Sequence, residues 1–317
     1  MAAQPAPGLP ARYRDVSELG RGAFGLVYRA VDAEGRAAAV KVLAPALATQ
    51  PGASWQFAGE LRKLSRLDHP AFPAALDEGR TDAGLPYYAM ALVDAPDLPP
   101  GPLPADEVAA VAADLAEALA YLHGLGLVHG DLKPDNVKRG ERLHLLDVGL
   151  MSLTGQAREA IAGTLEYLAP EVYRNAPVAP AADMYALGVL LYELQTGKTP
   201  FSGTPIQLVQ AHLMQAPSPL AGPLATLTMA LLSKDPAQRP TARGVLVALG
   251  LAEDQGPERP GLQGGGFIGR ADVLAAWDAL ETGVLHLAAG PGLGKSRTLE
   301  ECRLAAQLAG QAWVGAA

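Results

Sequence analysis

The sequence has little cysteine and no long apolar run, and each scarcity excludes a class of protein. Its 317 residues contain one cysteine, Cys302, which rules out an internal disulfide framework or a CxxC metal site and suits a reducing compartment. The longest apolar stretch, Met184 to Leu194, is too short for a membrane span and contains Glu193. The first ten residues lack the basic-then-apolar pattern of a signal peptide. We therefore expect a cytoplasmic protein with no membrane segment.

Lysine is also scarce, and acidic residues outnumber basic ones. Lys+Arg number 25 and Asp+Glu 33, a formal net charge of −8 at pH 7, which argues against a nucleic-acid partner. Hydrophobic residues at 49% and charged residues at 18% exclude an intrinsically disordered chain. The length fits two domains, or one large domain with an extension. Because only seven of the basic residues are lysines, the position of each lysine is informative.

The chain divides into a strand-rich region, a helical region and a C-terminal segment. A flexible tail is expected over 1–13, and a Pro-rich connector at 94–104 separates the strands from the helices. A second connector, 253–266, holds five glycines and two prolines. Strands are predicted at 16–19, 26–31, 36–43, 74–77 and 86–93. Helices are predicted at 54–67, 106–123, 181–195, 205–215, 223–233 and 241–251.

The first glycine-rich motif follows the pattern G-x-G-x-x-G at Gly20, Gly22 and Gly25. Dinucleotide-binding folds share this pattern, but there the glycines open a helix. Here they lie between two predicted strands, so that the backbone N–H groups of a hairpin could cover phosphates. A plain glycine hairpin without a ligand is the alternative.

A lysine, Lys41, stands near the end of the apolar strand that follows this hairpin. A lysine on a buried strand is costly unless its charge is paired, and Glu60 on the next predicted helix is the candidate partner. The alternative is a side chain that snorkels to solvent from the strand end.

The most specific motif is the octapeptide HGDLKPDN at 129–136, followed by Asp147 after an apolar strand. Asp131 can accept a proton from a hydroxyl group, and Lys133 can lie near a transferring phosphate. Asn136 and Asp147 are oxygen ligands that suit Mg²⁺. Together these groups supply what the transfer of a phosphoryl group needs.

With these motifs in this order, residues 14–251 closely resemble a eukaryotic-type (Hanks-type) serine/threonine protein kinase. The resemblance implies an α+β, bilobal fold over 14–252. Its N-lobe, 14–93, would be a small antiparallel β-rich lobe with one key helix, and its C-lobe, 94–252, larger and α-helical. The resemblance also implies ATP and Mg²⁺, with Mn²⁺ as a substitute, and a protein substrate with a Ser or Thr acceptor. Autophosphorylation is a further option.

The resemblance assigns roles residue by residue. The catalytic set is Asp131 as base, Lys133, Lys41 and Glu60, with Asn136 and Asp147 as metal ligands. The nucleotide-binding set is Leu19, Gly20, Gly22, Gly25, Val27, Ala39, Lys41, Met90, Ala91 and Val93. Thr164 and the position of Lys133 favour Ser/Thr over Tyr as acceptor. Structural roles are implied for Glu171 with Arg239, and for Asp183 and Gly188 in a large buried helix.

Three positions depart from the family pattern. Gly130 replaces the arginine that binds a phosphorylated activation segment, so we expect less dependence on such a phosphate. Val148 replaces a phenylalanine, which suggests looser coupling of the Glu60 helix to the site. Lys138 replaces a leucine under the adenine. Either its stem covers the ring, or the turn at 139–142 shifts the register.

A second glycine-rich turn, Ala289 to Ser296, resembles the start of an AAA/STAND-type P-loop ATPase. Gly294, Lys295 and Ser296 would bind phosphates and Mg²⁺, and a structural glycine loop is the alternative. Only 21 residues follow Ser296, so 267–317 would be a truncated α/β segment without hydrolysis. We expect a signalling kinase fused to an ATPase module in a longer protein. The alternatives are a pseudokinase and a nucleotide-binding regulatory module of a signalling ATPase.

Overall fold

The computed structural model describes residues 8–22, 25–48, 57, 63–65, 67–147, 152–153 and 164–253. These residues divide into two compact units. The first comprises the described residues up to Ser65 together with Ala74–Leu92, and the second comprises those of Arg66–Pro73 and Val93–Gly264. Glu60, Val148 and the predicted P-loop segment at 267–317 lie outside the described residues, as does most of the predicted helix at 54–67.

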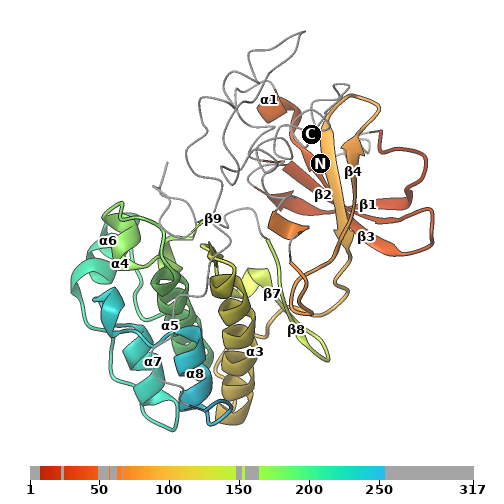
Figure 1. Ribbon diagram of the computed structural model, residues 1–317. Coiled ribbons are helices and arrows are strands. Elements are labelled where there is room, and N and C mark those ends of the chain that lie inside the picture. The colour runs from red at the N-terminus through yellow and green to blue at the C-terminus, as the bar shows by residue number, and fades with distance from the viewer. Residues whose placement is uncertain are drawn as a thin grey trace, which may run out of the picture. The chain divides into compact units, whose positions relative to one another are not determined.

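The first unit is built on a five-stranded antiparallel sheet with the strand order β1-β2-β3-β5-β4 (Figure 1). The strands are β1 (Arg14–Gly22), β2 (Gly25–Val31), β3 (Ala37–Leu43), β4 (Ala75–Arg80) and β5 (Pro86–Ala91), and a short helix α1 (Pro45–Ala48) follows β3. The predicted antiparallel β-rich lobe is therefore confirmed, with strand ends shifted by a few residues.

Residues Arg12 and Tyr13, predicted to lie in a flexible tail, instead pack on this sheet. The Tyr13 side chain is 6% exposed, and its ring meets Tyr87 edge-on at 5.7 Å between centroids. The Tyr13 hydroxyl donates to Asp77 Oδ2 at 2.6 Å, and Arg12 forms an ion pair with the same oxygen at 2.7 Å. The local composition of prolines and alanines could not predict this contact, because the partners Asp77 and Tyr87 lie on strands far along the chain.

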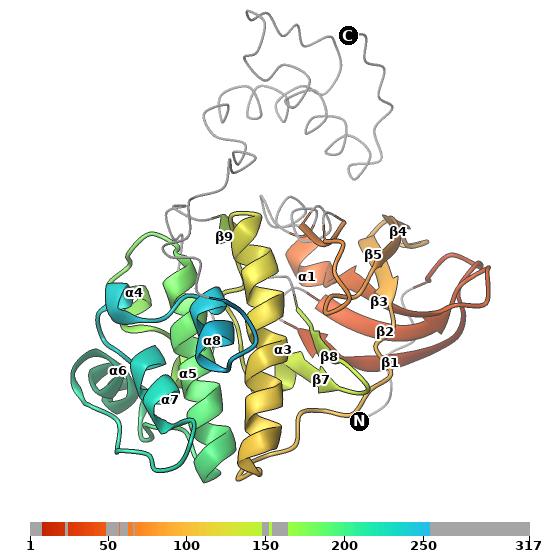
Figure 2. The ribbon, with the colours of Figure 1, turned by 60° about the horizontal axis from the view of Figure 1, so that its bottom comes forward.

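The second unit is mainly helical. Its described residues also form two short antiparallel strand pairs, β6 with β9 and β7 with β8, and one isolated bridge between Asp97 and Lys138. Its helices are α3 (Ala105–Gly124), α4 (Pro170–Tyr173), α5 (Pro180–Thr196), α6 (Pro205–Met214), α7 (Ala225–Leu231) and α8 (Ala242–Ala248). The short strands are β6 (Leu127–Val128), β7 (Val137–Arg139), β8 (Leu143–Leu145) and β9 (Ser152–Leu153), with 3₁₀ turns η1 (Pro134–Asn136), η3 (Leu165–Tyr167) and η4 (Pro236–Gln238). Figure 2 shows α3 and α5 side by side, with α7 and α8 packed near them.

Helix α5 is the core of this unit, because side chains all round it are buried. A helix that is apolar on every side belongs in an interior, as its sequence predicts. It begins with Pro180 at its first turn and ends at Gly197, whose φ of 75° closes the last turn. Helix α3 instead buries one stripe, which includes Val108, Leu115 and Leu122, and so confirms the predicted amphipathic pattern.

Helix α8 is shorter than predicted because a glycine cap ends it. Gly250 has φ 75°, and its N–H donates to the Val247 carbonyl, while the Leu251 N–H donates to Leu246. This pair of bonds is the Schellman arrangement, which satisfies the last carbonyls and turns the chain away.

A prediction follows from the contact of α5 with α7. A Cβ atom at Gly188 would lie 2.8 Å from Leu231 Cβ and 3.1 Å from its backbone carbon. We expect Gly188→Ala to lower the free energy of unfolding by about 1–3 kcal/mol through overpacking. Gly124→Ala is the matched control, because a Cβ at that helical position has no neighbour within 4 Å. Urea unfolding followed by circular dichroism measures both variants, and equal midpoints would contradict the packing argument.

Candidate active site

One buried carboxylate on α5, that of Asp183, anchors the HGDLKPDN loop through hydrogen bonds to its backbone. Asp183 is 1% exposed and accepts the backbone N–H groups of His129 and Gly130, each at 2.8 Å. His123 Nε2, from the end of α3, lies 2.9 Å from the same carboxylate. Burial alone would raise the pKa of Asp183, but the hydrogen bond and charge of His123, the charge of His129 and the Gly130 N–H outweigh it. The net effect is a lowered pKa.

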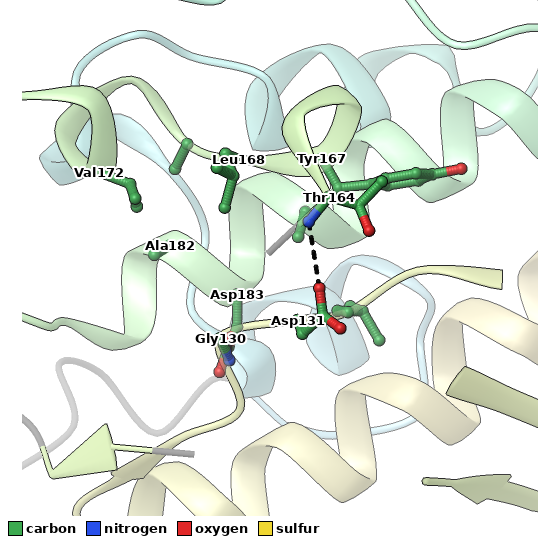
Figure 3. Close-up of a pocket in the computed structure, with 11 residues that line it drawn as sticks. Gly130, Asp131, Thr164, Tyr167, Leu168, Val172, Ala182 and Asp183 are labelled. Atoms are coloured by element: carbon green, nitrogen blue, oxygen red, sulfur yellow. Dashed lines mark hydrogen bonds between the residues drawn. The ribbon is translucent and has the colours of Figure 1, made fainter. Parts of the chain in front are cut away.

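Asp131, next in this loop, has both carboxylate oxygens positioned. Asn136 Nδ2 donates to Asp131 Oδ2 at 3.0 Å and to its carbonyl oxygen at 2.7 Å. The Thr164 N–H donates to Oδ1 at 3.3 Å, the dashed line in Figure 3. Lys133 Nζ lies 3.1 Å from Oδ2. The carboxylate is only 8% exposed, so its orientation is fixed by protein groups rather than by water.

Lys133 joins the loop to the segment at Thr164. Its ammonium donates to Thr164 Oγ1 at 2.9 Å while it contacts Asp131, and its side chain is 21% exposed. A cation at this place could meet a phosphate that approaches from solvent and neutralise part of its charge.

A regular hairpin brings the backbone positions of the two predicted metal ligands, Asn136 and Asp147, near each other. Strands β7 and β8 pair without a register shift, with Lys138 opposite His144, and the Leu146 N–H donates to the Asn136 carbonyl at 2.8 Å. Asp147 follows Leu146 directly and is exposed, with φ 59°. The Asn136 amide uses its NH₂ group on Asp131, which leaves its oxygen as the donor for a cation. An amide oxygen and a carboxylate are both ligand types that Mg²⁺ accepts.

No larger metal cluster among the described residues competes with this pair. Within the described part of the chain, no group of three or more His, Cys, Asp or Glu side chains could hold a metal ion. Nor does any described helix have the length and apolarity that crossing a membrane requires.

In the first unit, four residues of the predicted nucleotide set share one face of the sheet. In an antiparallel sheet, residues directly opposite each other project to the same face, as do alternate residues along a strand. Lys41 is opposite Val27, and Ala39 is opposite Met90, two positions along β3. Lys41 is 6% exposed, with Nζ 6.0 Å from the Tyr88 ring centroid, so the snorkelling alternative does not hold.

The glycine-rich hairpin has a structural requirement of its own. Gly22 pairs with Gly25 at its end. A Cβ atom at Gly25 would lie 1.9 Å from the Val42 carbonyl oxygen, whereas one at Gly20 would meet nothing within 4 Å. Gly25 is therefore needed for the approach of β2 to β3, whatever covers the hairpin. Gly20 has no such steric requirement among the described residues.

Lys138 and Gly130, which depart from the expected pattern, have clear local settings. Lys138 Nζ pairs with Asp97 Oδ1 at 2.5 Å across an isolated bridge, and Lys138 itself lies in the regular β7–β8 pairing. Gly130 has φ 81°, a conformation that favours glycine over arginine. Next to Gly130 lies a cavity of about 20 Å³, between Asp131 and Thr164 on one side and the α4–α5 region on the other (Figure 3). It has room for about one water molecule.

Comparison with known proteins identifies this arrangement. Residues 13–248 match the family described as protein kinase domain. The chain belongs to the protein kinase family. The match begins one residue before and ends three residues before the stretch 14–251 that carries the resemblance. Membership implies the use of ATP and a divalent metal ion.

Bacterial kinases are among the relatives of this kinase. It is 36% identical over 259 residues to serine/threonine-protein kinase pkn2 of Myxococcus xanthus, an alignment covering 73% of this chain and 31% of that protein. It is 36% identical over 260 residues to PkaA of Streptomyces coelicolor, covering 72% and 47%. Serine/threonine-protein kinase PknB of Mycobacterium leprae is 32% identical over 257 residues, covering 74% and 41%. The chain thus spans about a third to a half of the length of these relatives.

Two contacts of the kinase site escaped the sequence reasoning. His123 reaches Asp183 from 60 residues away, and nothing around it forms a motif. The Tyr167 hydroxyl, on η3 beside the pocket, donates to the Glu193 carboxylate of α5. Burial first, then the Glu193 hydrogen bond and nearby negative charges, raises the pKa of Tyr167. The sequence offers one signal for the Tyr167 contact, which is that an aromatic residue follows three positions after Thr164.

Proposed function

We propose that the chain is an active serine/threonine protein kinase that transfers the γ-phosphoryl group of ATP to Ser or Thr hydroxyls of protein substrates. The observation that carries the proposal is the Asp131 carboxylate, held by Asn136 and Thr164 with the Lys133 ammonium 3.1 Å away. The names of the relatives, each a serine/threonine-protein kinase, support the same reaction.

In this proposal Asp131 is the catalytic base. One carboxylate oxygen accepts the proton of the acceptor hydroxyl as the oxygen attacks the phosphorus atom. Lys133 stabilises the negative charge on the transferring phosphoryl group. Asn136 and Asp147 would hold Mg²⁺, with Mn²⁺ as a substitute, and the ion when bound offsets charge on the phosphates. Thr164 holds Asp131 and Lys133 in one geometry and supports a Ser or Thr acceptor.

We propose that the first unit supplies most of the nucleotide-binding groups, with Val93 contributed by the second unit. Val27, Ala39 and Met90 would contact the adenine, and Lys41 would contact the α- and β-phosphates. Their common face of the sheet supports this assignment. The remaining members of the proposed set are Leu19, Gly20, Gly22, Gly25, Ala91 and Val93 as nucleotide contacts, and Glu60 as the partner of Lys41.

The C-terminal segment remains a proposal from sequence. We propose that 14–252 is the kinase domain, 253–266 a linker and 267–317 the start of a P-loop ATPase domain. Gly294, Lys295 and Ser296 would form its phosphate-binding turn. The kinase would then be fused to an ATPase module in a longer, cytoplasmic signalling protein.

Transfer of label from γ-labelled ATP tests the proposed function. With Mg²⁺ and a mixture of unmodified proteins, we expect phosphoserine and phosphothreonine after acid hydrolysis, and no phosphotyrosine. Because phosphoryl transfer is assigned to the first 252 residues, Lys295→Ala should leave the rate unchanged. A rate that falls with Lys295→Ala would assign the activity to the P-loop. Nucleotide binding without transfer would indicate a pseudokinase.

A further inference from the structure

The outer face of α6 is apolar, although the fold of the second unit makes no use of it. The helix buries Leu208, Ala211 and His212 on its inner side. Ile206 and Met214 are 73% and 83% exposed, the two largest exposed fractions among the large hydrophobic side chains of the described residues. In Figures 1 and 2, α6 lies at the edge of the second unit. Exposed apolar side chains that gather on one helix mark an interaction surface.

The exposed side chains of α6 form one continuous stripe. Residues three or four positions apart lie side by side on the surface of a helix. Ile206 is therefore followed by the half-buried Val209 and the exposed Gln210, and these by the half-buried Leu213 and the exposed Met214. Ile206 and Met214 are eight residues apart, which is about 12 Å along the helix axis. The stripe thus has an apolar side chain at each end and an amide in the middle.

The segment that contains this stripe carries no charge. Residues 199–233 include no Asp, Glu, Lys or Arg, and their one histidine, His212, is buried. The whole chain has a net charge of −8, so two copies repel each other where their acidic faces meet. An uncharged face avoids this repulsion, and the cores of protein–protein interfaces are poor in charged residues and rich in methionine. A nucleic acid or an anionic lipid surface would find no basic group in this segment.

The stripe is also complementary to itself. In a dimer with twofold symmetry every contact occurs twice, because residue i meets residue j and residue j meets residue i. Two α6 helices that lie antiparallel and cross at Gln210 place Ile206 of each copy against Met214 of the other. Gln210 then faces Gln210 of the other copy. Two identical amides can pair, because each has both a donor and an acceptor, whereas two identical charges would repel. A second copy of the chain therefore fits this face.

We propose that the outer face of α6 is the contact surface of a homodimer, with Ile206 and Met214 as its apolar anchors and Gln210 on the twofold axis. A contact centred on one ten-residue helix from each copy is at the small end of specific interfaces, so the association is reversible. Helix α6 carries none of the residues assigned to phosphoryl transfer. The proposal is therefore independent of the proposed function.

Sedimentation velocity of the full chain at increasing concentration tests this contact. The parent should show a reversible monomer–dimer equilibrium with a dissociation constant below about 0.1 mM. Met214→Glu and Ile206→Lys should each raise that constant by more than about tenfold, because each removes an apolar contact from both halves of the dimer. Leu251→Glu is the matched control, since Leu251 is 62% exposed but lies outside α6, and it should leave the constant unchanged. Circular dichroism checks that every variant is folded.

A mixture of the two variants tests the antiparallel pairing itself. When Ile206→Lys and Met214→Glu chains are combined, the introduced lysine of one chain faces the introduced glutamate of the other, and the unchanged Ile206 faces the unchanged Met214. The mixture should therefore dimerise at concentrations where neither variant does alone. A parent that stays monomeric up to the stated concentration would overturn the proposal and leave this face to a different protein. A dissociation constant that Met214→Glu leaves unchanged, or a mixture that associates no better than its components, would also overturn it.

Discussion

We expect Asp131→Ala to lower the rate of phosphoryl transfer by about 10³-fold, because it removes the group assigned as general base. The fold should survive, since the alanine leaves no buried charge unpaired except Lys133, whose side chain reaches solvent. A coupled assay of product formation measures the rate, and circular dichroism checks the fold. Binding of ATP should change little, because the substituted carboxylate faces Asn136, Lys133 and Thr164.

The matched control for this variant is Asp106→Ala. Asp106 is an exposed carboxylate in the first turn of α3, so its loss should cost at most about 1 kcal/mol of stability and no activity. If Asp131→Ala kept more than a tenth of the parent rate, Asp131 would not be the base. If both variants lost activity together, the assay would be reporting stability rather than catalysis.

The second large effect concerns Asp183, whose carboxylate anchors the HGDLKPDN loop. We expect Asp183→Ala to lower the free energy of unfolding of the second unit by about 3–5 kcal/mol and to abolish activity. The change leaves the N–H groups of His129 and Gly130, and one nitrogen of His123, without their buried acceptor. Urea unfolding and the same kinase assay measure the two losses. If the free energy of unfolding fell by less than about 1 kcal/mol and activity were retained, the HGDLKPDN loop would keep its conformation without Asp183.

The contribution of Asp183 should also depend on pH in a defined direction. Its pKa is lowered in the folded chain, so the folded state holds the ionised form more tightly than the unfolded state does. The stabilisation is then complete above the unfolded pKa of about 4 and is lost as the pH falls through the folded value. The parent should lose stability below about pH 4, and Asp183→Ala should lose less over the same range.

The parts of the site that could be predicted are those fixed by nearby residues. The spacing of Asp131, Lys133 and Asn136 is set within six positions, and the turn η1 places Asn136 against Asp131 by local geometry. The sheet was predictable for a similar reason, because alternation and short turns fix the register between successive strands such as β2 and β3. The pairing of Val27 with Lys41 then follows without long-range information.

The parts that could not be predicted depend on residues far apart in the chain. Asp183 meets Gly130 across 53 positions, and Tyr13 meets Asp77 across 64. A periodic pattern reports which face of a helix is buried but not which donor that face will meet. The contacts of Lys234 could not be predicted for the same reason. Its Nζ donates hydrogen bonds to the Tyr185 hydroxyl of α5 and to the Ala211 carbonyl of α6. Closure entropy and packing decide such contacts, and neither can be read from local spacing.

The measurement that tests the account most directly is the stoichiometry of label transferred from γ-labelled ATP to a protein acceptor, for the parent and for Asp131→Ala side by side. The account predicts that the parent forms labelled phosphoserine and phosphothreonine through many turnovers, and that the variant binds ATP but transfers at about a thousandth of the parent rate. A parent that binds ATP and Mg²⁺ yet transfers no label would contradict it.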